Sequence, residues 1–235
     1  GASMARMSEV FDAEPDIKDA PDAVDADSLL GPIEIRNLTF EFDKEEGPVF
    51  DNLSVKFPKG KTTGIVGRTG SGKTTLINLL LRLYDPPEGT VFFDGFDVRK
   101  LRVNLLRGSV GIVPQDSFLF SESIAENIAF GQTKAPRETV IEAASVAQLL
   151  DDVKGFPEGF DTLVGERGVT LSGGQKQRAA IARAVLLDPN ILILDDSLSA
   201  VDVETEEAIL NRLRGIREGK TCLIVSHRIL TVKDA

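Results

Sequence analysis

The chain has 235 residues and a formal net charge of −10, with 42% hydrophobic and 27% charged residues, which is the composition of an ordinary globular domain with a sizeable core. A single cysteine excludes an internal disulfide, a single histidine excludes a multi-histidine zinc centre, and the acidic balance disfavours a general nucleic-acid binder. No apolar run reaches the roughly 18 residues that a membrane-spanning helix needs, so the chain is not itself a membrane pore.

The acidic charge is concentrated near the start of the chain. Eight acidic residues and one lysine lie between Ser8 and Ser28, a local charge of −7, so the rest of the chain carries only −3. Two prolines and many alanines accompany them, and this composition predicts a solvated linker. Gly1-Ala2-Ser3 before Met4 resembles a cloning remnant, and no secretory signal is visible. We therefore expect residues 1–31 to be a tag remnant and an acidic linker, and residues 32–235 to form one domain exposed to the cytosol.

The domain opens with two apolar segments of period two, Ile33–Phe42 and Val49–Phe57, which predict a pair of antiparallel strands joined by a turn. A short apolar strand at Thr62–Val66 then leads through a glycine-rich turn into a leucine-rich helix at Lys73–Tyr84. This order of strand, loop and helix begins an α/β unit.

The remaining elements alternate between strands and helices. Because the strands are continuously apolar, they predict a mostly parallel sheet covered on both faces, preceded by the antiparallel β layer. A helix-rich stretch between Ser117 and Gly168 indicates a helical subdomain over about residues 117–180. The expected strands are 90–93, 110–113, 191–194 and 221–225, and the expected helices are 137–152, 174–187 and 203–214.

One motif carries a specific chemistry. It matches the phosphate loop G-x-x-x-x-G-K-[ST] between a strand and a helix, where such a match requires it. Its glycines let backbone N–H groups converge on phosphates, Lys73 neutralises the β and γ phosphates, and Thr74 offers a hydroxyl to Mg²⁺. The alternative is a glycine-rich turn with an exposed lysine. The predicted nucleotide-binding residues here are Gly67, Arg68, Thr69, Gly70, Ser71, Gly72, Lys73, Thr74 and Thr75.

A Mg²⁺–nucleotide site also needs a carboxylate at the carboxyl end of a nearby strand. The apolar strand Ile191–Leu194 is followed by Asp195, which we predict to be associated with the metal. The alternative is a buried strand that merely ends in a polar turn.

A second anion-binding sequence opens a later helix, where Leu171, Ser172, Gly173, Gly174 and Gln175 spell LSGGQ. Its hydroxyl and N–H groups could face a phosphate, or these residues could simply cap a helix. The phosphate loop, LSGGQ and the Asp-ended strand, in this order and spacing, resemble the nucleotide-binding domain of an ABC transporter. The resemblance implies a P-loop NTPase fold and a head-to-tail dimer, in which the LSGGQ of one subunit closes over ATP held by the phosphate loop of the other.

The resemblance implies roles for four further residues. Phe42 corresponds to the aromatic residue that stacks on adenine, although Tyr is commoner there and a strand aromatic facing inward is the alternative. Gln115 matches the glutamine that contacts Mg²⁺ and the attacking water. Asp202 matches the D-loop aspartate at the dimer interface. His227, after the strand at 221–225, matches the switch histidine that contacts the γ-phosphate, rather than being an incidental histidine.

Two other segments resemble exporters in particular. Leu163–Gly168 is similar to a loop that lies near the coupling helices of the membrane domain, and Ser8–Pro15 is similar to the segment that follows the last membrane helix. The resemblance therefore implies a transmembrane domain with coupling helices on the same native polypeptide, and a location on the cytoplasmic face of the membrane. Because the family continues beyond the switch histidine while this chain stops at Ala235, we expect an excised fragment.

One departure from the family pattern concerns catalysis. Asp196 stands where hydrolytic members place glutamate, next to Asp195. Aspartate is roughly 1.3 Å shorter, and a misplacement of about 1 Å can cost on the order of 100-fold in rate, unless the loop geometry compensates. We expect a weak site, as in asymmetric exporters whose heterodimeric partner supplies the glutamate.

Two alternatives to a transport motor are a regulatory module and an ATPase of DNA repair. A regulatory module would bind ATP with negligible hydrolysis, so the ATPase rate that Asp196 supports distinguishes it from a motor. An ABC-type ATPase of DNA repair would need coiled-coil heptads or a basic face, and the sequence has neither. The transported substrate is not encoded in this chain.

Overall fold

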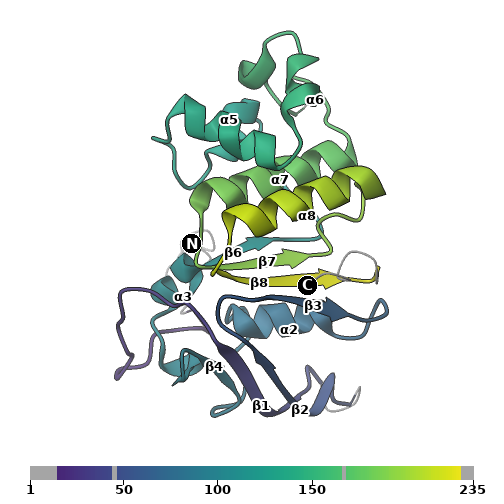
Figure 1. Ribbon diagram of the computed structural model, residues 1–235. Coiled ribbons are helices and arrows are strands. Elements are labelled where there is room, and N and C mark those ends of the chain that lie inside the picture. Colours follow the sequence, from purple (N-terminus) through teal and green to yellow (C-terminus); the bar gives the residue numbers. More distant parts are fainter. Residues whose placement is uncertain (1–14, 44–46, 166–167, 229–235) are drawn as a thin grey trace, which may run out of the picture.

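The computed structural model in Figure 1 describes residues 15–43, 47–165 and 168–228. Two sheets and their helices form its layers. Helices α7 and α8 lie on one face of a parallel sheet, α2 lies on the other face, and an antiparallel sheet lies beyond α2 (Figure 1). Most of the segment Ser8–Pro15, and two residues of the loop 163–168, fall outside the described residues.

The antiparallel sheet has the strand order β2-β1-β4-β5. Ile33 pairs with Phe57 on one side and with Phe93 on the other, and all three side chains are buried. The alternating pattern thus faces one side of the sheet to the core, as period two requires. Its strands are β1 (Ile33–Phe40), β2 (Phe50–Phe57), β4 (Val91–Phe93) and β5 (Phe96–Asp97).

The expectation for the strand at 90–93 needs one correction. The sequence places it with the strands of the parallel sheet, but β4 pairs antiparallel with β1. A three-residue strand is too short to reveal its pairing partner, which the long-range register with β1 decides.

The parallel sheet has the order β3-β8-β7-β6, and its three strand pairs are all parallel. All residues of β7 and β8 are buried, in agreement with the continuously apolar sequence. Alternate side chains of β7 enter two separate cores: Ile191 and Ile193 pack toward α2, whereas Leu192 and Leu194 pack toward α7 and α8. The strands are β3 (Thr62–Val66), β6 (Val110–Val113), β7 (Ile191–Asp195) and β8 (Thr221–Ser226).

Two of the predicted helices differ in extent from those in the structure. The helix after the phosphate loop ends at Leu80 rather than Tyr84, because Arg82 adopts a positive φ of 49°. The 137–152 helix divides in two, since Gln148 adopts a φ of 56°. The covering helices are α2 (Lys73–Leu80), α3 (Val103–Ser109), α7 (Gly173–Leu187) and α8 (Val203–Ile216).

The segment between β6 and α7 is helical and packs above α7 in Figure 1. Its buried side chains, such as Val140 and Val153, join the same core as Ile181 of α7. Its elements are α4 (Ile124–Ile128), α5 (Arg137–Val146), α6 (Leu150–Lys154) and the 3₁₀ turn η2 (Gly159–Asp161), whereas η1 (Val98–Lys100) precedes α3.

The described part of the acidic segment contacts the domain, although its acidic side chains are exposed, and its role as a linker stays a prediction. The carbonyl of Lys18 accepts a hydrogen bond from buried Arg82, and the carboxylate of Asp19 accepts one from the N–H of Val103. Leu29 is 1% exposed. Composition alone missed these contacts because they use backbone groups. None of the helices in the described ranges has the length and hydropathy of a bilayer-spanning helix.

Candidate functional site

The phosphate loop occupies the turn between β3 and α2. Gly70 and Gly72 adopt positive φ values of 80° and 87°, a conformation that residues with a Cβ rarely adopt. At Gly72 an added Cβ would also lie 2.9 Å from a methyl carbon of Val49. Lys73 donates hydrogen bonds from Nζ to the carbonyls of Gly67 and Arg68, at 2.7 and 2.8 Å. The ammonium group is thus folded over the loop whose N–H groups would surround an anion.

Asp195 ends β7 beside the first turn of α2. The hydroxyl of Thr74 donates a hydrogen bond of 3.2 Å to Oδ2 of Asp195, although 121 residues separate them in the sequence. Asp195 is 4% exposed, and burial raises the pKa of its carboxyl group, against the opposing effect of the Thr74 hydrogen bond. A buried carboxylate and a hydroxyl fit Mg²⁺, which binds through one or two carboxylates together with substrate phosphates. No cluster of three or more His, Cys, Asp or Glu side chains that could hold a metal occurs in the described residues.

Asp196 and His227 form a pair at the ends of neighbouring strands. Because β7 and β8 are parallel neighbours, the residues that follow them meet at one edge of the sheet. Nδ1 of His227 lies 2.9 Å from both carboxylate oxygens of Asp196. The N–H of Asp196 donates to the carbonyl of Val225, and its φ of 48° turns the side chain out of the strand. A carboxylate in this position can orient or deprotonate a water molecule, and the imidazole can donate to a phosphate oxygen.

These groups line one cleft of about 280 Å³, close to the lower end of the roughly 300–1,000 Å³ of small-molecule pockets. The cleft unites most of the predicted phosphate, metal and catalytic residues, including Gln115, which follows β6. It is lined by Val49, Thr69, Gly70, Gly72, Lys73, Thr74, Thr75, Gln115, Asp195, Asp196 and His227.

Phe42 lies outside this set of lining residues. Its ring is 53% exposed and contacts the rings of Phe40 and Tyr84 edge to face, each at a centroid distance of 5.1 Å. The side chain is therefore neither an inward-facing strand aromatic nor part of the cleft wall among the described residues. Its predicted role in adenine stacking stays a prediction.

The LSGGQ residues also lie outside the cleft lining. Ser172 caps α7: its hydroxyl accepts a hydrogen bond from the N–H of Gln175, and its own N–H donates one to the side-chain oxygen of Gln175. Leu171 is buried, whereas Ser172 and Gly173 are exposed. Within one chain the cap is thus the visible role of Ser172 and Gln175.

Asp202 is the N-cap of α8. Its carboxylate accepts a hydrogen bond of 2.9 Å from the N–H of Thr205, and this bond lowers the pKa of Asp202. The predicted role at a dimer interface stays a prediction beside this local one.

The sequence did not identify three residues that line the cleft or contact the loop after Asp196. Val49 lines the cleft from the loop before β2, and no local signal marks it. Gln177 and Arg228 both hydrogen-bond to Ser199, in the loop after Asp196. Their position next to recognised motifs is the only signal that could have identified them.

The fold and the cleft together define a phosphate-loop nucleotide-binding domain. Comparisons with known proteins agree. The family description "ABC transporter" matches residues 50–199. The chain is 44% identical over 234 residues to the uncharacterized ABC transporter ATP-binding protein YwjA of Bacillus subtilis, covering 100% of this chain and 40% of that protein. It is 45% identical over 206 residues to the ATP-dependent lipid A-core flippase of Photorhabdus laumondii, covering 87% and 36%.

A solved structure of a bacterial Atm1-family ABC exporter with ATP bound superposes with a TM-score of 0.93 at 39% identity, covering 100% of this chain and 41% of that one. The chain therefore belongs to the ABC transporter family. It is an ATP-binding domain of the ATPase class found in that family. It spans less than half the length of these relatives.

Proposed function

We propose that this chain is the ATP-hydrolysing motor domain of an ABC exporter and works head to tail with a second nucleotide-binding domain. One observation carries the proposal: the phosphate loop, both aspartates and His227 line one cleft, while LSGGQ opens another helix outside that lining. A cleft open to solvent would be completed by the exposed N–H groups of a second subunit's LSGGQ. Relatives of more than twice this length support attachment to a transmembrane domain, at the cytoplasmic face of a membrane.

The residues of the cleft have separate roles in phosphoryl transfer from ATP to water. Lys73 and the loop N–H groups bind the phosphates, and Thr74 and Asp195 would hold Mg²⁺, which neutralises charge on the phosphate oxygens. Asp196 and His227 orient the attacking water and the γ-phosphate, and Gln115 lies in the same cleft. The protein acts by positioning and electrostatic stabilisation.

We further propose that the site built on this chain is weak and that its natural partner is a different subunit with glutamate at the position of Asp196. The carboxylate of Asp196 is already engaged at 2.9 Å by His227. A shorter side chain held in this way reaches less far into the cleft than glutamate would. ATP at this site would then act as a latch, while this chain lends its LSGGQ to a competent site.

The test is the steady-state ATPase rate of the purified chain with Mg²⁺ and ATP. We expect Asp196→Glu to raise kcat by about 10- to 100-fold. Asp151→Glu is the matched control, because Asp151 has an exposed carboxylate on α6, and this change should leave the rate as it is. A wild type that is already fast, and is unaffected by Asp196→Glu, would refute the weak site. If the Asp196→Glu variant shows no ATPase activity even when it is assembled with a partner that carries glutamate, the regulatory alternative replaces the motor.

Association is tested separately by light scattering after size exclusion. Saturating Mg²⁺–ATP should convert the Asp196→Asn variant from monomer to dimer. A chain that remains monomeric with itself and with any co-purifying ABC subunit contradicts the shared-site arrangement.

A further inference from the structure

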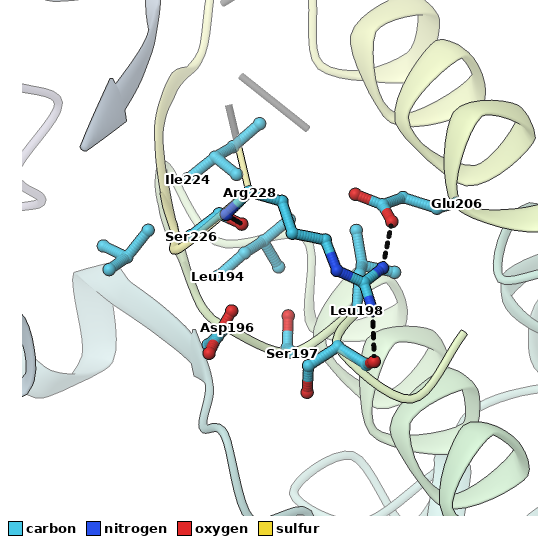
Figure 2. A pocket seen from close by; sticks show the side chains of 10 residues that line it. Leu194, Asp196, Ser197, Leu198, Glu206, Ile224, Ser226 and Arg228 are labelled. Carbon is cyan, nitrogen blue, oxygen red and sulfur yellow. Dashed lines mark hydrogen bonds and ion pairs between the residues drawn. The ribbon is translucent and has the colours of Figure 1, made fainter. Parts of the chain in front are cut away.

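The residue after the switch histidine connects three parts of the fold. Arg228 follows the end of β8 and extends toward α8, as Figure 2 shows. Its Nη1 donates to Oε2 of Glu206 at 3.2 Å, and its Nη2 donates to the carbonyl of Ser199 at 2.8 Å. Its own N–H donates to the hydroxyl of Ser226 at 2.9 Å. Both ends of Arg228, backbone and guanidinium, are therefore held.

Burial of Glu206 makes this attachment hard to release. Glu206 lies on α8 and is 5% exposed, yet among the described residues its other oxygen, Oε1, has no hydrogen-bond partner. A buried carboxylate that loses a cationic partner is strongly destabilised, so Glu206 retains the guanidinium of Arg228. A lysine could serve Glu206 or the Ser199 carbonyl, but its single ammonium lacks the planar fork that reaches both.

The helix that carries LSGGQ also contacts the loop that contains Ser199. The side chain of Gln177 on α7 donates to the hydroxyl of Ser199 at 3.1 Å and accepts from the N–H of Ala200 at 2.9 Å. The backbone of Gly174 approaches so closely that an added Cβ would lie 2.8 Å from the carbonyl oxygen of Ala200. The segment 199–200 is thus clamped between α7 and Arg228.

We propose that Arg228 is a positioning residue that holds His227 against Asp196 and links this pair, through residues 199–200, to the LSGGQ helix. The inference rests on the proposed function, because the position of His227 against Asp196 matters only where the γ-phosphate of ATP is bound. Movement of α7 when a partner's nucleotide meets LSGGQ would shift Ser199 and, through Arg228, the backbone that carries His227. Each site would in this way sense occupancy of the other.

The chain offers a direct readout of this linkage because it contains one histidine. The Cε1–H resonance of His227 can therefore be assigned without ambiguity in the nucleotide-free chain at fixed pH. Asp196→Asn should shift this resonance, since it replaces the carboxylate that contacts Nδ1. Arg228→Ala should move it at least halfway to the Asp196→Asn position, and Arg228→Lys by less.

Two further variants control for misfolding of Arg228→Ala and for the loss of an unrelated ion pair. Glu206→Gln keeps the side-chain shape but removes the ion pair, so it should move the resonance in the same direction as Arg228→Ala, even if that variant folds poorly. Arg36→Ala removes an exposed pair with Glu34 on β1 and should leave the resonance at the wild-type position. An unmoved resonance in Arg228→Ala and Glu206→Gln, or in Asp196→Asn itself, would overturn the proposal.

A second arm separates this proposal from the function on which it rests. In the purified chain made competent by Asp196→Glu, Arg228→Ala should lower kcat by about 10- to 100-fold and leave the KM for ATP unchanged. In a His227→Ala background the same change should have no added effect, because Arg228 acts through His227. Independent, multiplying losses would refute the positioning role. A transporter without ATPase activity refutes the proposed function, while the resonance test of Arg228 still stands.

Discussion

Gly174 is the point at which the LSGGQ helix touches the loop after β7, and Gly174→Ala tests that contact. The new Cβ would lie 2.8 Å from the carbonyl oxygen of Ala200 and 3.6 Å from its carbonyl carbon. The obstacle is backbone, which cannot rotate away as a side chain can. The helix start and the loop must therefore separate by several tenths of an ångström.

Two opposing effects set the size of the change. Replacing glycine by alanine in a helix contributes about 1 kcal/mol of helix propensity. Overpacking against a fixed neighbour costs about 1–3 kcal/mol, so the net loss in the free energy of unfolding is about 1 kcal/mol. For a domain of this size that corresponds to a fall of about 2–4 °C in Tm. The contacts of Gln177 with Ser199 and Ala200 would lengthen as well.

Gly215 provides the matched control. It lies in α8, and an added Cβ there meets no heavy atom within 4 Å. Gly215→Ala should therefore raise Tm by up to about 4 °C. Both values can be measured by circular dichroism without nucleotide. If Gly174→Ala raised Tm as much as Gly215→Ala, the close approach of α7 to residues 199–200 would be refuted.

Two further predictions concern buried ionisable groups. Burial raises the pKa of Cys222 to about 11 from 9.0, so the unfolded chain loses its thiol proton first and the free energy of unfolding falls between about pH 9 and 11, by up to about 3 kcal/mol. Denaturant titrations of Cys222→Ala should lack this part of the decline; an identical pH slope in both proteins contradicts the burial. Burial also raises the pKa of Asp195, so above the ordinary aspartate range its charge opposes folding. Asp195→Asn should raise the nucleotide-free Tm yet weaken Mg²⁺-dependent ATP binding about tenfold or more, measured by calorimetry; a lowered Tm with unchanged binding would refute both roles.

The phosphate loop and the strand ends were predictable from local sequence. The turn between β3 and α2 needs glycine where φ is positive, and a continuously apolar run such as Ile191–Leu194 identifies a strand buried on both faces. The start of α7 was predictable to within one residue, because Ser172 and Gln175 form a capping box. These features depend on neighbours within a few positions.

The pairing of elements depended on the whole chain. Sequence alone misassigned the strand at 90–93 and joined α5 to α6, because register with β1 and the turn at Gln148 are not local properties. It also did not reveal the Arg82–Lys18 contact, which joins residues 64 positions apart. The site follows the same division. Sequence determined which chemical groups exist, whereas the adjacency of β7 and β8 brought Asp196 to His227, and the packing of α2 against β7 brought Thr74 to Asp195. Long-range strand pairing fixes these distances, and no local pattern encodes it.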